Sequence, residues 1–210
     1  MTTIALQLAP SRSRGSARAW FEVACVVGGS LLIAGLAQLS FHLPFTPVPI
    51  TGQTLGVLLV GAALGPALGA TSVGLYLLEG AIGLPFFAAG ASGAETLRLT
   101  SATGGYLWGF VLAAMLVGWL SRHGWDRSMR SSISAMLLGS IVIYALGVTW
   151  LYHALPATVA GERTTMQTAL ELGLYPFVIG DLIKLLIAAA LLPGAWRLVG
   201  RLRPDETSAP

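Results

Sequence analysis

The stretch from residue 42 to residue 110 is predominantly apolar, but glycine and proline interrupt it repeatedly. Polar side chains occur in it at few places, among them Gln53 and Glu79. In a membrane, irregular glycine-rich backbone is tolerated where it is buried in protein or lines a cavity. We therefore expect this stretch to wall a substrate pocket, which Asp181 and Lys184 near the far end of the chain would complete.

The composition places the chain in a lipid bilayer. Of its 210 residues, 55% are hydrophobic and only 10% are charged, whereas an average soluble domain is about 25% charged. We predict an all-α membrane protein with a single transmembrane domain over residues 1–210. The net charge of +3 does not indicate a nucleic-acid partner, because the arginines cluster at the ends of apolar segments, where membrane topology explains them.

The apolar segments predict a bundle of six transmembrane helices. One helix over residues 54–82 would contain about 29 residues and rise about 43 Å, which exceeds the hydrocarbon core of about 30 Å. We therefore place a break at Gly65-Pro66. The expected spans are about 20–41, 49–65, 66–82, 104–121, 131–152 and 174–193.

The basic residues predict how this bundle is oriented. With six spans, one side of the membrane holds Arg12, Arg14, Arg18, Arg122, Arg127, Arg130, Arg197, Arg201 and Arg203. The other side holds only Arg98 and Arg163. The positive-inside rule then places the N- and C-termini in the cytoplasm. We expect a multi-pass protein of the cell inner (plasma) membrane. A count of five spans would move the arginines of residues 122–130 outside and is the weaker alternative.

Asp181 and Lys184 are an ionisable pair inside an expected span. Their spacing of three residues puts them on one helical face, roughly 10 Å below the outer end of the span. Ionisable side chains at such depth are costly unless they are paired or solvated, and they mark function by default. We interpret the pair as part of a binding site. An internal ion pair that only fixes helix packing is the alternative.

Three further polar residues are candidates for the same site. Glu79 follows Tyr76 by three residues, and either faces Lys184 or lies at the water interface. Arg98, in the long outer loop, could bind a carboxylate or be a solvated loop residue. Thr103 opens the fourth span, where free N–H groups favour an anion, although it could equally be a plain helix cap.

The first expected span carries small residues at helical spacing. Ala24 and Gly28 form one such pair, and Ser30 and Ala34 form another. Small residues four apart permit close helix approach. They indicate either ordinary packing inside the bundle or a face that docks another membrane subunit.

Several chemical functions find no support in the sequence. His42, His123 and His153 are scattered and show no metal-ligand spacing. No P-loop, CxxC motif or nucleophile–base set is present, so we do not expect an enzyme. Because no ATPase motif is present, ATP-driven transport would need a partner chain. A proton-coupled carrier could use Asp181 and Glu79 as a relay, but no internal inverted repeat is visible.

Several motifs occur together within residues 20–193, namely Pro47-Val-Pro-Ile-Thr-Gly-Gln53-Thr, Leu64-Gly with Gly69 and Ser72, Tyr76-Leu, Gly83-Leu-Pro85, Phe87-Ala, Thr103-Gly-Gly-Tyr-Leu and Gly180-Asp-Leu-Ile-Lys184. In this combination the chain resembles the BioY family, the biotin-binding substrate subunits (S components) of energy-coupling-factor (ECF) transporters. The early proline-rich segment, the TGGYL motif and the late D-x-x-K pair are specific together, whereas each alone would be weak.

The resemblance implies a six-helix bundle that binds biotin near its outer face. It implies a membrane-spanning coupling (T) subunit and two cytoplasmic ATPase subunits as partners, with some family members standing alone. The small-residue face of the first span resembles the surface that such S components use for docking. No cofactor is implied, because biotin is the transported ligand.

Carried over residue by residue, Asp181 and Lys184 resemble the polar pair for the ligand head group. A ureido ring offers two N–H donors and one C=O acceptor, which a carboxylate and an ammonium complement. A buried site of this kind would reject analogues that lack those groups. The other substrate-binding residues that we expect are Gln53, Tyr76, Glu79, Phe87, Arg98, Thr103 and Tyr106, with Phe86 and Trp108 beside the apolar parts of biotin.

Other functions remain open at this point. The chain could be an S component for another small vitamin, or a stand-alone secondary carrier. A membrane enzyme or assembly factor is the alternative from a different class. A homo-oligomer is also compatible with the sequence.

Overall fold

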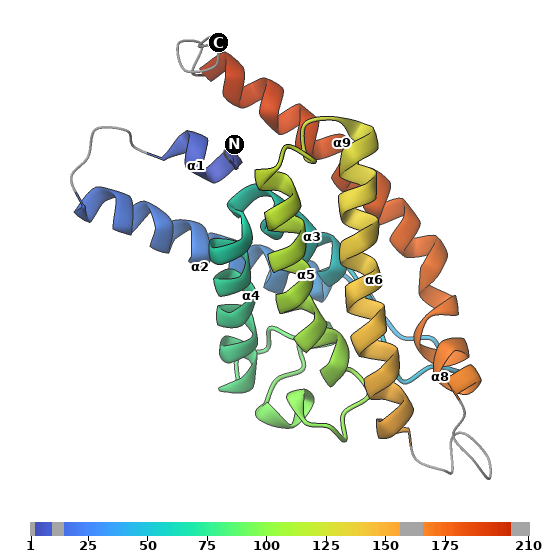
Figure 1. Ribbon diagram of the computed structural model, residues 1–210. Helices are drawn as coiled ribbons and strands as arrows, with labels where there is room; N and C mark the ends of the chain where they lie inside the picture. Colours follow the sequence, from blue (N-terminus) through green and yellow to red (C-terminus); the bar gives the residue numbers. More distant parts are fainter. Residues whose placement is uncertain (1–2, 10–14, 156–165, 203–210) are drawn as a thin grey trace.

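The computed structural model describes residues 3–9, 15–155 and 166–202. Arg12, Arg14, Arg163 and Arg203, which enter the orientation argument, lie outside the described residues. The described helices and strands (Figure 1) are, in chain order, α1 (Ile4–Leu8), α2 (Ser16–Gln38), β1 (Ser40–Phe41), β2 (Ile50–Thr51), α3 (Gln53–Leu64), α4 (Pro66–Ala81), the 3₁₀ turns η1 (Ala88–Gly90) and η2 (Ala94–Leu97), α5 (Gly104–Arg122), α6 (Met129–Ala154), α8 (Met166–Gly173), the 3₁₀ turn η3 (Tyr175–Phe177) and α9 (Val178–Leu202).

Four helical segments of the described chain are long and apolar enough to cross a membrane: α2, α5, α6 and the continuous stretch Met166–Arg201 that ends in α9. The protein is therefore a multi-pass helical membrane protein. The expected spans 49–65 and 66–82 correspond to α3 and α4, which have 12 and 16 residues. At 1.5 Å per residue these two helices are shorter than a hydrocarbon core of about 30 Å.

The break predicted at Gly65-Pro66 is confirmed. Gly65 has a φ of 86°, which a helix cannot contain, and Pro66 opens α4 at its first position, where its missing N–H costs nothing. The chain reverses here, so α3 and α4 pack side by side, and both contact α5. Gly118 of α5 allows this contact, because a Cβ at this position would lie 2.4 Å from the carbonyl carbon of Gly65.

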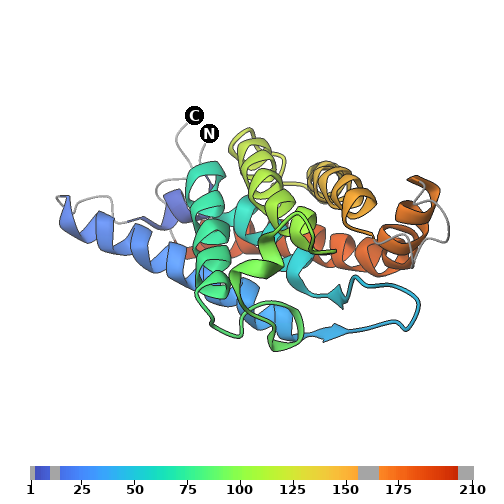
Figure 2. The ribbon, with the colours of Figure 1, turned by 90° about the horizontal axis from the view of Figure 1, so that it is seen from below.

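The helices form two layers. Helices α4, α5 and α6 lie next to one another in a row, and α2 and α9 lie on one side of that row (Figure 2). Helix α3 contacts α5 and α4 in the row as well as α2 and α9. The buried core follows this arrangement, because its fully buried side chains include Ile33 of α2, Val57 of α3, Tyr76 of α4, Val117 of α5 and Ile143 of α6.

Residues 39–52, which we call the strap, connect α2 to α3 without forming a helix. Strands β1 and β2 pair in antiparallel fashion, with Ser40 opposite Thr51. Three prolines between these strands exclude a helix. The strap extends toward α8 (Figure 2), where the Thr46 hydroxyl donates a hydrogen bond of 2.5 Å to the carbonyl of Leu172.

The expected boundaries differ from the observed ones at both ends of the chain. The sequence predicts a first span over residues 20–41, but α2 begins at Ser16 and ends at Gln38, because the strap follows it with β1. The last span was placed at 174–193, but α9 continues through Pro193 to Leu202. Residues 166–173, which lie between the expected spans 131–152 and 174–193, form α8.

Candidate ligand-binding site

A cavity of about 190 Å³ lies where the strap meets the first turns of α3, α5 and α9. This volume is roughly ten times what a single buried water needs. The cavity is lined by His42, Pro47, Val48, Pro49, Thr51, Gln53, Thr54, Phe87, Ala88, Ala91, Thr96, Thr103, Tyr106, Leu107, Phe110, Ile143, Tyr144, Phe177, Asp181 and Lys184. About half of these residues carry polar side chains, so the wall combines apolar and aromatic surface with polar groups that can orient a small molecule.

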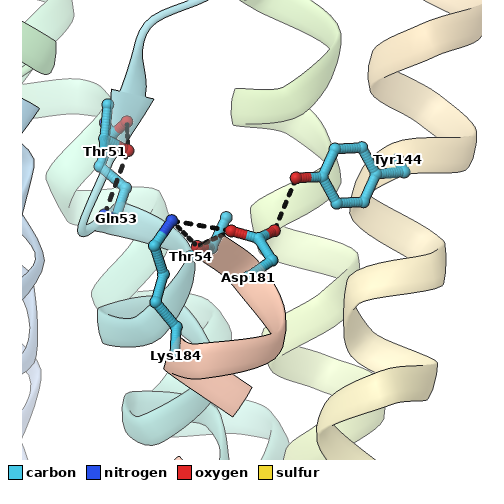
Figure 3. A network of polar contacts seen from close by, with 6 residues as sticks. All are labelled: Thr51, Gln53, Thr54, Tyr144, Asp181 and Lys184. Carbon is cyan, nitrogen blue, oxygen red and sulfur yellow. Dashed lines mark hydrogen bonds and ion pairs between the residues drawn. The ribbon is translucent and has the colours of Figure 1, made fainter. Parts of the chain in front are cut away.

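Asp181 is the centre of the polar network in this cavity (Figure 3). Its Oδ1 lies 2.7 Å from Nζ of Lys184, one turn further along α9. Its Oδ2 accepts a hydrogen bond of 2.6 Å from the Tyr144 hydroxyl on α6. Thr54 of α3 joins both charges, since its hydroxyl donates to Asp181 at 3.4 Å and accepts from Lys184 at 3.3 Å. Three helices thus hold one ion pair.

The pair is largely withdrawn from solvent, with 18% of the Lys184 side chain and 11% of the Asp181 side chain exposed. An ion pair in such surroundings is tolerated because each charge has several hydrogen-bonding partners. Lys184 has three N–H donors, of which the described contacts with Asp181 and Thr54 use two. A carboxylate offers about four acceptor sites, and Asp181 uses three of them for Lys184, Tyr144 and Thr54. Counting contacts within residues 3–9, 15–155 and 166–202, one donor and one acceptor therefore remain for a ligand.

Gln53 forms a second polar group at the start of α3. Its side-chain oxygen accepts a hydrogen bond of 2.9 Å from the Thr51 hydroxyl, and its amide donates to the hydroxyl of Tyr76. Tyr76 is fully buried behind the cavity and packs edge-on against Phe87, with ring centroids 5.7 Å apart. These contacts fix which way the Gln53 amide faces.

Aromatic rings form much of the remaining wall. The rings of Tyr106 and Tyr144 meet edge-on with centroids 6.1 Å apart, and the centroid of the Phe177 ring lies 6.5 Å from that of Tyr144. The Tyr106 hydroxyl donates a hydrogen bond of 2.8 Å to the carbonyl of Gly173. These aromatic contacts and the hydrogen bond of Tyr106 hold the rings in place in the apolar part of the wall.

The structure brings together most of the residues that the sequence suggested for the site. Those that line the cavity are Gln53, Phe87, Thr103, Tyr106, Asp181 and Lys184. Those that do not line it are Tyr76, Glu79, Phe86, Arg98 and Trp108. Tyr76 lies one layer behind Gln53, and Trp108 is 46% exposed and donates to the carbonyl of Leu97 at 3.2 Å. Arg98 is exposed on the outer loop.

Of the two placements left open for Glu79, the one that faces Lys184 is not the one observed. Glu79 accepts a hydrogen bond from the Ser30 hydroxyl, which joins α4 to α2. This contact also corrects the expected docking face, because Ser30 is fully buried and Ala34 is only 5% exposed. Ala24 and Gly28 remain exposed on α2, and Gly28 has open space around it.

Several residues that line the cavity were not individual candidates, and outside the stretch 42–110 these are Ile143, Tyr144 and Phe177. Tyr144 could have been found as a polar hydroxyl within the apolar run Ile141–Leu146. Phe177 carries no such signal, because an aromatic residue in an apolar segment is ordinary core.

The fold and the site define a membrane-embedded helical protein that binds a small ligand with a polar head and an apolar body. A model of the BioY family matches residues 11–201. The chain belongs to the BioY family.

Individual relatives agree with this assignment. The chain is 39% identical to a biotin transporter BioY of Rhizobium etli, over 71% of this chain and 78% of the relative. It is 33% identical to a biotin transporter BioY of Rhodobacter capsulatus, over 85% and 96%. Among solved structures, the S component for biotin from an ECF-type ABC transporter aligns with a TM-score of 0.71 and 26% identity, covering 92% of this chain and 96% of that one.

Proposed function

We propose that this protein takes up biotin, as the substrate-binding membrane subunit of an ECF transporter. It binds biotin from the outer face and releases it inward without changing it chemically. The observation that carries this proposal is the Asp181–Lys184 pair, which lies in the wall of the cavity and keeps one acceptor and one donor unused. A ureido ring supplies the complementary N–H and C=O groups, and the aromatic wall suits the rest of the molecule.

Equilibrium binding to the full-length protein in detergent tests the proposal, with intrinsic tryptophan fluorescence as the signal. We expect tight binding of biotin to the wild type and a loss of about 100-fold in Asp181→Asn, because a charged hydrogen bond at a buried site is worth about 3 kcal/mol. Glu79→Gln is the matched control, since it removes an acid outside the cavity wall. A folded wild-type protein that binds no biotin would exclude the biotin assignment.

An S component for another small vitamin is the second candidate, and a panel of ligands separates the two. Desthiobiotin keeps the ureido ring and should compete with biotin. Lipoic acid has a similar carboxylate chain without a ureido ring and should not compete, because buried polar groups left unpaired reject such analogues strongly. Competition by lipoic acid as strong as by desthiobiotin would contradict recognition through the ureido ring.

The finer architecture belongs to the same proposal. We infer that the six spans are α2, α3, α4, α5, α6 and α9. Both termini then lie in the cytoplasm, and the protein lies in the cell inner membrane. The likeness to an S component supports a coupling subunit and two ATPase subunits as partners. Of the predicted docking residues, Ala24 and Gly28 are exposed on α2, where a partner subunit could contact them. Uptake of labelled biotin with and without co-expressed partner subunits distinguishes this arrangement from a stand-alone carrier.

A further inference from the structure

Helix α9 continues past the expected end of its span, from Pro193 to Leu202. Arg197 and Arg201 in this part lie four residues apart, and hence on one face of the helix, and both are exposed. Leu198 beside them is 58% exposed. The end of α9 thus combines cations on one face with exposed apolar surface, the pattern of helices that lie in a membrane interface.

The connection between α5 and α6 is fastened to this part of α9, and both lie at the same end of the bundle (Figure 1). The indole nitrogen of Trp196 donates a hydrogen bond of 2.6 Å to Oδ2 of the buried Asp126. Arg127, the next residue, is exposed, and its guanidinium lies 4.8 Å from the centre of the same indole ring. Arg127 therefore joins the two cations of α9 in one surface, and we call Arg127, Arg197 and Arg201 the basic patch.

The charge of the basic patch has no acidic partner nearby in the chain. Within the α5–α6 connection and the end of α9 the one acid is Asp126, which is fully buried. Neither ion pair of the described residues includes the patch. The Nε of Arg197 donates to the carbonyl of Pro193 at 3.3 Å, and the terminal nitrogens of this guanidinium have no partner among the described residues. The patch therefore presents its positive charge to an external anion.

We propose that the basic patch binds the phosphate head group of an anionic phospholipid. A guanidinium matches the oxygens of a phosphate with parallel hydrogen bonds, and several cations together attract a lipid that carries a net negative charge. Tryptophan, here Trp196, is typical of the level of the head groups. The exposed Leu198 fits the acyl chains that follow the head group, which a soluble phosphate does not offer. This site is separate from the cavity around Asp181 and does not depend on the ligand bound there.

Native mass spectrometry of the full-length protein in a neutral detergent tests the proposal, by titration with phosphatidylglycerol and with phosphatidylcholine. Each arginine near an anionic lipid surface contributes about fivefold, so we expect the wild type to bind phosphatidylglycerol roughly 100-fold more tightly than phosphatidylcholine. Arg197→Gln/Arg201→Gln should keep only about a fivefold preference, because Arg127 remains. Arg18→Gln is the matched control and should keep the wild-type preference, because it removes an exposed cation that is paired with Glu22 on α2.

Arginines that serve only membrane topology would give equal binding of the two lipids by the wild type, and this result would overturn the proposal. An unchanged preference in Arg197→Gln/Arg201→Gln would overturn it too, as would an equal loss in Arg18→Gln, which indicates general charge attraction. Glycerol phosphate is the soluble form of the same head group, and displacement of the lipid by an equal concentration of it would exclude a lipid site. Because the substituted residues are exposed, the variants should melt at the temperature of the wild type.

Discussion

The Tyr144 hydroxyl holds the Asp181 carboxylate from the side opposite Lys184 (Figure 3). Without it, Oδ2 loses a hydrogen bond of 2.6 Å and the carboxylate gains freedom to rotate away from the ligand. We expect Tyr144→Phe to weaken biotin binding by about 10-fold, the value of one hydrogen bond to a charged group, as measured by isothermal titration calorimetry. Tyr175→Phe is the control. Tyr175 is 56% exposed, so this variant should bind biotin as the wild type does.

The residues of the site differ in how far the sequence predicts them. Asp181 and Lys184 were predictable as partners because they lie on one helix, where a spacing of three fixes their geometry. Tyr144 reaches Asp181 from another helix, and this contact depends on how α6 and α9 cross. Glu79 shows the same limit, because its direction was decided by the packing of α4 against Ser30 of α2.

The close contact between α5 and the α3–α4 turn depends on Gly118. An added Cβ would lie 2.4 Å from the carbonyl carbon of Gly65 and 2.5 Å from the nitrogen of Pro66, and this backbone at the α3–α4 turn cannot move aside as a side chain can. Gly118→Ala should therefore lower the free energy of unfolding by about 1–3 kcal/mol, as overpacking does. Thermal unfolding in detergent measures the effect.

Gly74→Ala provides the comparison for that variant. Gly74 lies inside α4, and nothing lies within 4 Å of a Cβ at this position. Alanine is favoured over glycine in a helix interior by about 0.5–1 kcal/mol, so this variant should unfold at the same temperature as the wild type or a higher one. Equal losses in the two variants would contradict the role assigned to the α3–α4–α5 contact.

The connection between α5 and α6 is joined to α9 by a buried acid. Asp126 is fully buried, and its Oδ2 accepts a hydrogen bond of 2.6 Å from the indole nitrogen of Trp196. The guanidinium of Arg127 lies 4.8 Å from the centre of the same indole ring. Burial raises the pKa of the Asp126 carboxyl, while the bond from Trp196 and the charge of Arg127 oppose that shift.

A raised pKa in the folded state makes stability depend on pH in a defined direction. The folded protein holds the Asp126 proton more tightly than the unfolded chain, whose aspartates titrate near pH 3.9. The contribution of the protonated Asp126 carboxyl to stability is therefore complete below about pH 4. It is lost as pH rises through the pKa of this carboxyl in the folded state. Asp126→Asn keeps an acceptor for Trp196 but cannot lose a proton. The melting temperature of this variant, relative to that of the wild type, should therefore rise between about pH 4 and pH 7. Parallel pH profiles of the two proteins would contradict this assignment.

At the scale of the whole molecule, the number and direction of the spans can be tested by labelling. In a Cys25→Ser background, single cysteines at Glu95, Ala67 and Met129 occupy exposed positions in the outer loop, at the α3–α4 turn and at the start of α6. With six spans and cytoplasmic termini, a membrane-impermeant thiol reagent added to intact cells should label Glu95→Cys only. Labelling of Ala67→Cys from outside would show that α3 and α4 do not both cross.

The class of membrane protein was predictable from composition, because long apolar segments with few charges are suited to a lipid bilayer and not to water. The turn at Gly65-Pro66 followed from the limit that bilayer thickness places on one helix. The β1–β2 ribbon could not be read from the sequence, because strands of two residues are too short to show a period, and contacts such as that between Thr46 and Leu172 join distant parts of the chain. Helix α8 does separate its apolar and polar residues at helical spacing, but it has only eight residues and is too short to be expected as a span.

The cavity wall is divided between helices and the strap. The Asp181–Lys184 pair and its partners Thr54 and Tyr144 are held by three helices, whereas Pro47, Val48 and Pro49 of the strap line the cavity from a segment without helix. The strap hydrogen-bonds to α8 from Thr46 to Leu172. Under the proposed function, we expect substitutions at Thr46 to change how long biotin stays bound more than they change which molecule is bound.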